Sequence, residues 1–272
     1  MHTFGRREVK VKPRILIVAS TKGGVGKTTV ALGIASALCR MEKKVLLCDL
    51  DFENKCLDMF MGLEDVSLYN IADVARGFVT AEIAVVSNNR GLSFISAPVG
   101  VRLAGESGED SISDSDLVKA LKSAIDVKDV DFVILDTPAG HTVTDAVAKA
   151  FPNAEGITVA SHQPASMKGA ENASRILISH GIENNRLVIT GFEPESATRD
   201  VRAGVIEIID SSRVRMIGVV PYDRSLMLSH EKGVMAPASC PANKAFSNIA
   251  GRICGEEIPL FTGLNIKKIR VL

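Results

Sequence analysis

Short apolar runs rich in β-branched residues alternate with amphipathic stretches along almost the whole chain. Several of the runs, such as ILIVA and FVIL, are apolar throughout. Strands that are buried on both faces of a sheet have this character, and strands separated by helical stretches form parallel sheets through right-handed βαβ units. We therefore expect one α/β domain, with a single doubly wound, mostly parallel sheet flanked by helices. The expected strands are Arg14–Ser20, Lys44–Leu50, Leu92–Ala97, Asp131–Asp136, Gly156–Ala160, Arg186–Thr190 and Val214–Val220.

The composition is that of a globular protein with a full-sized core. Of the 272 residues, 46% are hydrophobic and 24% are charged, and 32 basic residues balance 32 acidic ones. A formal charge of zero argues against a surface that attracts nucleic acid as a whole. No apolar run reaches the ~20 residues of a membrane-spanning helix. The basic N-terminus is not followed by the apolar run of a signal peptide, so we expect a cytoplasmic protein.

We expect three segments along the chain. Residues 1–12 are rich in basic residues and are predicted to form a disordered arm, residues 13–257 the folded domain, and residues 258–272 a tail. The five cysteines are scattered and contain no CxxC pair. This pattern favours reduced thiols over a disulfide framework or a metal site formed within one chain.

A glycine-rich segment joins the first expected strand to the first expected helix, Thr28–Met41. Glycines in this setting let backbone N–H groups turn towards one anion, and the helix N-terminus adds its positive dipole end. Lys27 would reach the β- and γ-phosphates of a nucleotide, Thr28 would bind Mg²⁺, and Thr29 would bond the α-phosphate. The predicted phosphate loop consists of Lys22, Gly23, Gly24, Val25, Gly26, Lys27, Thr28 and Thr29.

A carboxylate ends the fourth expected strand. Asp136 follows the four apolar residues of FVIL. Because the carboxyl ends of parallel strands face the ligand crevice of an α/β sheet, a buried and rigid strand would deliver this carboxylate to the Mg²⁺ shell. Asp49 and Asp51 come after the second strand in the same way. Aspartate is also a common turn or cap residue after a strand, and this alternative stays open for Asp49 and Asp51.

The phosphate loop departs from the general pattern GxxxxGK[ST]. Thr21 stands where the first glycine is expected, and Lys22 adds a second lysine. The segment resembles the deviant Walker A signature KGGxGK[ST]T of the MinD/ParA family of ATPases. The resemblance implies ATP and Mg²⁺ as cofactors and a homodimer in the ATP state. Lys22 would then reach across the dimer to the partner's phosphates, where a cation stabilises the transition state.

Further segments resemble the same family, and most closely its MinD branch, between about residues 14 and 259. The resemblance implies that Asp51 orients the attacking water and that Asp49 supports the first switch. Asp136, Pro138 and Gly140 would form the second switch. The segments that carry the resemblance are Cys48–Asp51, Leu57–Gly62, Asp136–Gly140, Ile217–Asp223 and Ala242–Glu257. The last of them matches the family's C-terminal helix, and Pro221 and Asp223 would lie near the nucleotide base.

Two positions differ from that family. Thr190 and Gly191 stand where an asparagine that reads adenine is usually followed by arginine, and Cys56 stands where MinD proteins tend to have a polar residue. The sequence therefore leaves open the contacts to adenine and the details of the first switch.

The resemblance implies an ATPase of low intrinsic rate that is stimulated by dimerisation and by an unidentified protein partner. Its role would be spatial regulation such as division-site placement. A ParA-like partition ATPase that binds DNA, a flagellar-placement ATPase and a nucleotide-driven metal carrier or reductase component are the alternatives. The zero net charge weighs against DNA, and the absence of a CxxC pair weighs against metal transfer, which Cys56 alone keeps open.

The tail, IPLFTGLNIKKIRVL, mixes apolar residues with Lys267, Lys268 and Arg270. MinD proteins end in a short amphipathic helix that lies in the membrane interface, so the tail would bring the chain to the anionic inner face of the cell membrane. The geometry favours this less, because Pro259 and Gly263 limit a helix to about nine residues and its apolar side chains spread around the wheel. A tail that packs on its own domain is the alternative.

Overall fold

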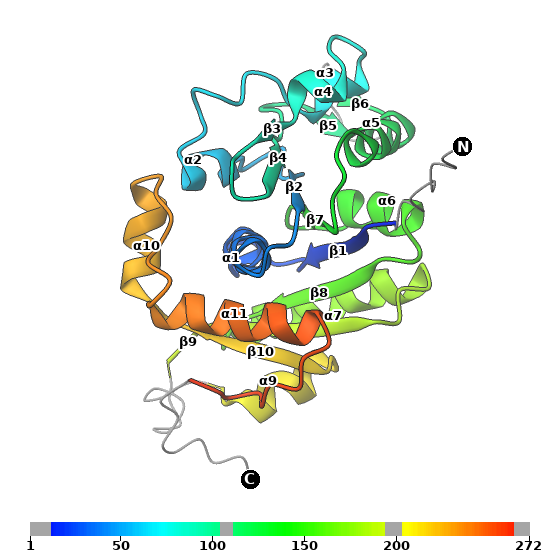
Figure 1. Ribbon diagram of the computed structural model, residues 1–272. Coiled ribbons are helices and arrows are strands. Elements are labelled where there is room, and N and C mark those ends of the chain that lie inside the picture. Colours follow the sequence, from blue (N-terminus) through cyan, green and yellow to red (C-terminus); the bar gives the residue numbers. More distant parts are fainter. Residues whose placement is uncertain (1–11, 104–110, 194–202, 264–272) are drawn as a thin grey trace, which may run out of the picture.

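The computed structural model describes residues 12–103, 111–193 and 203–263. An eight-stranded sheet forms its centre and helices cover both faces (Figure 1). All neighbouring strands in this sheet run parallel, except for the edge strand β3, which is antiparallel to β4. In spatial order the strands are β10 (Met216–Pro221), β9 (Asn185–Phe192), β8 (Glu155–Ala160), β1 (Arg14–Ala19), β7 (Phe132–Asp136), β2 (Val45–Asp49), β4 (Leu92–Ile95) and β3 (Val86–Ser87).

The seven strands expected from the sequence are all present, and the doubly wound, mostly parallel sheet is confirmed. Sequence reasoning missed the edge strand β3 and a separate pair formed by β5 (Arg102–Leu103) and β6 (Ser111–Ile112). Each of these strands is two residues long. A run of two residues is too short to show the alternation by which a strand is recognised.

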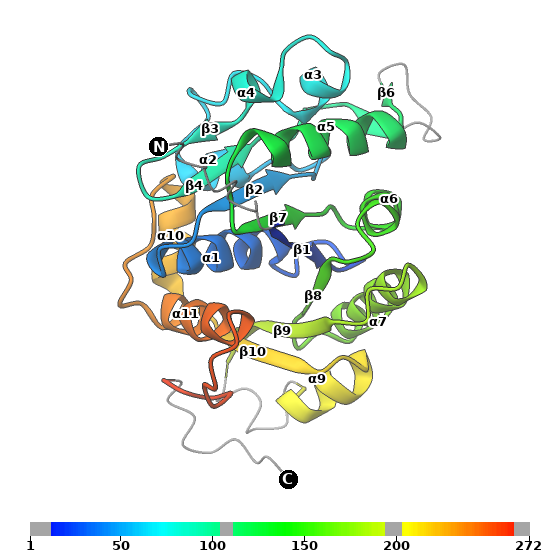
Figure 2. The same cartoon turned by 45° about the vertical axis from the view of Figure 1, so that its right-hand side comes forward.

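The helices form two layers (Figures 1 and 2). The helices α1 and α11 pack together over one face of the sheet, and α5, α6 and α7 cover the other. The helices are α1 (Lys27–Arg40), α2 (Leu57–Met61), α3 (Ile71–Ala75), α4 (Ala81–Ala84), α5 (Asp114–Val127), α6 (Thr142–Ala150), α7 (Pro164–Ser179), α9 (Val205–Ser212), α10 (Arg224–Glu231) and α11 (Pro241–Ile253).

The continuous apolar run of β1 has a direct structural reason. Leu16 and Val18 pack in the core under α1 and α11, whereas Ile17 and Ala19 pack in the core under α5 and α6. None of these four side chains is exposed. Because successive residues of a strand point to opposite faces, a central strand covered on both sides needs an apolar residue at every position.

The last helix is shorter than the segment that resembles it in sequence. Residues 242–257 were expected to be helical, but α11 ends at Ile253, and Gly255 has a φ of 94° that a helix does not accommodate. The chain then runs back along α11, where the Arg252 guanidinium donates to the Ile258 carbonyl at 2.8 Å and the Asn248 amide donates to the Thr262 carbonyl at 2.7 Å. The first part of the expected tail therefore lies on the domain. Residues 1–11 of the expected arm and residues 264–272 lie outside the described residues.

The order of the strands places the ligand crevice. The central strand β1 lies between β7 and β8, and β7 lies next to β2. Chain order therefore reverses beside β1, and ligands of α/β sheets bind outside the carboxyl ends of the strands at such a point. Asp49 at the end of β2 is in register with Asp136 at the end of β7. Among the described residues, no helix is long and apolar enough to cross a membrane.

Candidate functional site

The loop between β1 and α1 has the backbone of an anion site. Gly24 and Gly26 have φ values of 73° and 91°, which side-chain-bearing residues rarely adopt. Gly26 precedes the first turn of α1, which has no side-chain cap and no acidic residue. From Lys22 to Thr29, no backbone N–H donates to another backbone group within the described residues. These N–H groups are therefore available to phosphate oxygens.

Lys27 is a buried cation that has no carboxylate partner at ion-pair distance among the described residues. Its Nζ lies 3.5 Å from the Lys22 carbonyl oxygen. Burial lowers the pKa of Lys27, and the charges of Asp136 and Asp51 act in the opposite direction. Phosphate oxygens in the loop would supply the negative charge that this ammonium group lacks.

Asp136 is fully buried, and neither of its carboxylate oxygens has a hydrogen-bond partner of ordinary geometry in the described structure. Burial, followed by the charge of Asp49, raises the pKa of Asp136 well above its usual value, although the nearby Thr28 hydroxyl and Lys27 favour the charged form. An unpaired buried carboxylate is costly unless a cation compensates it. A carboxylate beside a threonine hydroxyl is the oxygen donor set that Mg²⁺ prefers, so these residues fit the ion.

Asp49 and Asp51 organise the loop that follows β2. Asp49 accepts hydrogen bonds from the backbone N–H groups of Asp51 at 3.0 Å and Leu57 at 3.3 Å. Asp51 accepts from those of Glu53 at 3.2 Å and Asn54 at 2.8 Å. Burial raises the pKa of Asp49 to about 7 despite these bonds. The two carboxylates thus shape residues 51–56, the predicted first switch.

The segment predicted to form the second switch is hydrogen-bonded to β1 and to the predicted phosphate loop. The Thr137 hydroxyl donates to the Val18 carbonyl at 2.9 Å, and the Gly140 N–H donates to the Thr21 carbonyl at 3.3 Å. Gly140 has a φ of 100°, so the turn that contains Pro138 needs a glycine there. A movement of the predicted phosphate loop would therefore shift residues 137–140 through these hydrogen bonds.

Thr190 serves the phosphate loop, a role that the sequence did not indicate. Its buried hydroxyl donates to the Val25 carbonyl at 2.6 Å and lies 3.3 Å from the Ala160 carbonyl. β9 continues past this residue to Phe192. The resembling family usually has an adenine-reading asparagine at this position. In this chain the side chain instead donates a hydrogen bond to the backbone of the predicted phosphate loop.

The structure places Asp223 in a cap. One of its oxygens accepts from the backbone N–H groups of Ser225 at 2.9 Å and Leu226 at 3.3 Å, and the other accepts from Ala242 at 3.1 Å. Burial works against the charged form, but these bonds prevail and the pKa of Asp223 is lowered. Asp223 thereby joins the starts of α10 and α11, while Pro221 ends β10. A contact of either residue with the nucleotide stays a prediction.

Cys56 lies beside the metal-binding candidates. Burial raises the pKa of its thiol to about 11, with the charge of Asp49 next in importance, while the Thr28 hydroxyl acts in the opposite direction. The thiol therefore stays protonated at neutral pH. Cys56 precedes α2, so the helix begins where the first switch ends.

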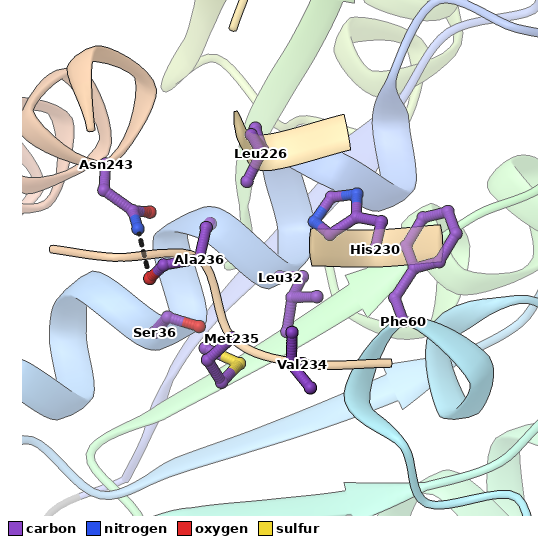
Figure 3. Close-up of a pocket in the computed structure, with 10 residues that line it drawn as sticks. Leu32, Ser36, Phe60, Leu226, His230, Val234, Met235, Ala236 and Asn243 are labelled. Atoms are coloured by element: carbon purple, nitrogen blue, oxygen red, sulfur yellow. Dashed lines mark hydrogen bonds between the residues drawn. The ribbon is translucent and has the colours of Figure 1, made fainter. Parts of the chain in front are cut away.

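α2 is fixed against α10. The Phe60 ring stacks on the His230 ring with centroids 4.3 Å apart, and both line a small pocket of about 10 Å³ (Figure 3). A side chain on Gly62 would meet the Gly233 carbonyl at 2.5 Å, so the two backbones cross closely. Burial lowers the pKa of His230, which favours the neutral, stacking form. The helix α2 thus packs against α10 and the residues that follow it, a contact that the sequence pattern did not indicate.

The structure brings Lys27, Thr28, Asp49, Asp51 and Asp136 close enough together to influence one another's charges, near the carboxyl ends of β2 and β7. Lys22, by contrast, is exposed at the mouth of the loop.

Comparison with known proteins finds relatives that are similar in sequence and in fold. The ParA family model, described as NUBPL iron-transfer P-loop NTPase, matches residues 10–254. The septum site-determining protein MinD of Synechocystis sp. is 33% identical over 254 residues, which are 90% of this chain and 91% of that protein. The MinC:MinD cell division protein complex of Aquifex aeolicus contains a chain of TM-score 0.76 and 28% identity, with 91% of this chain and 98% of that chain covered. Septum site-determining protein MinD from Pyrococcus horikoshii, complexed with Mg-ADP, has a TM-score of 0.72 at 20% identity and covers 90% of this chain and 100% of its own, a likeness of fold.

Proposed function

The chain belongs to the ParA family of P-loop NTPases, and we propose that it is a MinD-type ATPase that dimerises around Mg²⁺ and ATP and acts in division-site placement. The observation that carries the proposal is the buried, unpartnered carboxylate of Asp136 beside Thr28 and Lys27. This charge arrangement is incomplete without a divalent cation and a polyphosphate. The similarity to MinD over 90% of the chain supports the cellular role.

Each residue of the crevice has a proposed task. Lys27 and the loop N–H groups hold the β- and γ-phosphates, and Thr28 and Asp136 hold Mg²⁺. The ion neutralises charge on the phosphates when it is bound. Asp51, which lies two residues after β2 and accepts from two backbone N–H groups, orients the attacking water. Asp49 keeps the first switch attached to β2.

Lys22 is proposed to act on the phosphates of a second chain. It is exposed, whereas the neighbouring Lys27 is buried, so only Lys22 is presented to a partner. A chain on its own lacks this cation at its phosphates, and hydrolysis by monomers is therefore slow. A second copy would supply it, and an activating protein partner would act on the dimer.

We predict that Asp51→Ala binds ATP and accumulates as a dimer, because the phosphate contacts remain while the water is no longer oriented. Lys22→Ala is expected to bind ATP with an affinity within about threefold of the parent and to hydrolyse it at least about 100-fold more slowly. Light scattering at micromolar protein, with ATP or ADP and Mg²⁺, measures the first effect. Phosphate release measures the second.

Asp65→Ala is the control, because Asp65 is an exposed carboxylate beyond α2. It should dimerise transiently and hydrolyse ATP like the parent. A strictly monomeric Asp51→Ala protein in ATP would contradict the dimer.

We also propose a cytoplasmic pool that is recruited to the anionic inner face of the cell membrane by the tail. One tail would bind weakly, and a dimer would present two, so that the second attachment becomes intramolecular. Deletion of residues 264–272 should abolish ATP-dependent sedimentation with anionic liposomes and leave ATP hydrolysis without lipid unchanged. The deletion starts at 264 because residues 258–263 pack along α11. Equal sedimentation of the full-length and shortened proteins would favour DNA or a protein scaffold as the surface.

A nucleotide-driven metal carrier is the second candidate, because the matching family model is described as an iron-transfer NTPase. The five cysteines all lie in the described ranges and are free thiols. Within those ranges, no group of three or more histidine, cysteine or acidic side chains is arranged to hold a metal. Iron retained by the purified dimer, and lost with Cys56→Ser, would favour this candidate over division-site placement.

A further inference from the structure

The helix α7 contains a glycine in its interior, at position 169. Glycine weakens a helix relative to alanine, so a buried glycine here calls for a packing reason. A Cβ built at Gly169 would lie 2.7 Å from the Lys22 Cβ and 2.9 Å from the Lys22 backbone nitrogen. Both atoms belong to the base of Lys22 rather than to the flexible end of its side chain. Gly169 thus allows the main chain at Lys22 to lie directly on α7.

Hydrogen bonds also hold the residue before Lys22, Thr21, against Gly169. The Gly169 carbonyl accepts from the backbone N–H of Thr21 at 3.2 Å and from the Thr21 hydroxyl at 3.3 Å. On its other side, the Thr21 carbonyl accepts from the Gly140 N–H at 3.3 Å. The residue before Lys22 is therefore held between α7 and the second switch.

We propose that Gly169 is the positioning residue for Lys22. Its missing side chain and its carbonyl together set where the base of this lysine lies and from where its ammonium group reaches the partner's phosphates. The inference rests on the proposed function of Lys22 across the dimer. Lys27 lies at the other end of the loop, where α1 and the Thr190–Val25 contact hold it. Gly169 therefore acts directly on the base of Lys22, whereas Lys27 contacts this part of the loop only through its Nζ, which lies 3.5 Å from the Lys22 carbonyl oxygen.

The test is Gly169→Ala in the full chain. The added carbon must displace the main chain at Lys22, and small misplacements of a catalytic cation cost large factors in rate. We expect ATP hydrolysis at micromolar protein to fall at least about tenfold. The Kd for a fluorescent ATP analogue should change less than about threefold, because the contacts of Lys27 and the loop N–H groups remain.

Mixing of variants separates a defect in Lys22 from a damaged loop. In a dimer of a Gly169→Ala chain with an Asp51→Ala chain, the Gly169→Ala chain keeps its own Asp51 and receives a correctly placed Lys22 from its partner. An equal mixture of these two inactive proteins should recover about a quarter of the parental rate, because half of the dimers would each contain one complete site. A loop damaged in its own chain would give no recovery.

Lys22→Ala mixed with Asp51→Ala is the reference, and should recover to the same extent. If this reference pair stays inactive, Lys22 does not act across a dimer, and the proposed function and the inference both fail. If the reference pair recovers while the Gly169→Ala pair does not, or if Gly169→Ala alone hydrolyses ATP like the parent, only the inference is overturned.

Asn172→Ala is the matched control. Like Gly169→Ala it raises the helix propensity of α7, but it adds no atom near Lys22, so this variant should keep the parental rate. If Gly169→Ala does not fold, Thr21→Val takes its place in the mixture. It removes the hydroxyl bond to the Gly169 carbonyl, and we expect a loss of rate of about fivefold to tenfold. The mixture with Asp51→Ala should then rise to about a quarter of the parental rate. A loss that Asp51→Ala leaves unrestored would overturn the inference.

Discussion

Lys27→Ala is expected to weaken ATP binding by at least about 100-fold. Lys27 is the buried cation nearest to the predicted position of the β- and γ-phosphates, and burial already lowers its pKa. A hydrogen bond to a charged group contributes about 1.5–3 kcal/mol, and two such bonds correspond to a factor of about 100 or more in Kd. The loop N–H groups remain, so some affinity for phosphate should persist.

Isothermal titration with ATP and Mg²⁺ measures the loss, and thermal unfolding without nucleotide shows that the variant is folded. Lys119→Ala is the control, because Lys119 is an exposed lysine that pairs with Asp116 on α5. Its affinity for ATP should match that of the parent. Parental affinity in Lys27→Ala would mean that the loop between β1 and α1 is not the phosphate site.

The fold was predictable because its signals are local. The apolar runs of β1, β2 and β7 are buried on both faces, and the sequence shows this burial directly. The MinD/ParA resemblance, drawn from the second lysine and the DTPAG segment, is confirmed by the family model and by the MinD relatives. That Asp49 and Asp136 lie together at the carboxyl ends of β2 and β7 was predictable from the parallel sheet alone.

The contacts that support the site could not be predicted, because they join distant parts of the chain. Thr190 and Val25 are 165 positions apart, and Thr21 and Gly169 are 148 apart. A threonine at the end of a strand and a glycine within a helix are ambiguous until the neighbouring loop is known. The sequence suggested instead that position 190 concerned adenine. The roles of the site residues in hydrolysis stay predictions.

The predicted length of the last helix was wrong, also because of contacts that the sequence does not show. Family resemblance extended it to Glu257, whereas the backbone turns at Gly255, and Arg252 binds the carbonyls that follow. A glycine within a helical pattern is tolerated or ends the helix, depending on where the next residues can pack. Here the chain after Gly255 finds its partners on α11 itself.

Asp136→Asn is expected to make the nucleotide-free protein more stable and to reduce Mg²⁺-dependent hydrolysis by at least about 100-fold. Asparagine keeps the shape of the side chain but removes a charge that lies fully buried and, among the described residues, has no hydrogen bond of ordinary geometry. Removing such a charge should raise the free energy of unfolding by about 1 kcal/mol or more. The same charge is what would hold Mg²⁺ together with Thr28, so stability is gained at the expense of activity.

The pH dependence tests the physical cause of this gain. Burial raises the pKa of Asp136 in the folded state, so the folded protein binds a proton more tightly than the unfolded chain, and the parent loses stability as the pH rises from the ordinary aspartate pKa towards the raised one. Asp136→Asn lacks this loss, while Asp49, with its pKa of about 7, titrates in both proteins. The difference in unfolding free energy should therefore be larger at pH 8 than at pH 5.5. Denaturant melts without Mg²⁺ at the two pH values measure it, and Asp65→Asn is the exposed control.

An Asp136→Asn protein that is less stable than the parent at pH 8, or one that hydrolyses ATP normally, would contradict this account. Either result would show that the charge of Asp136 is compensated within the chain and that Asp136 is not the ligand of the ion.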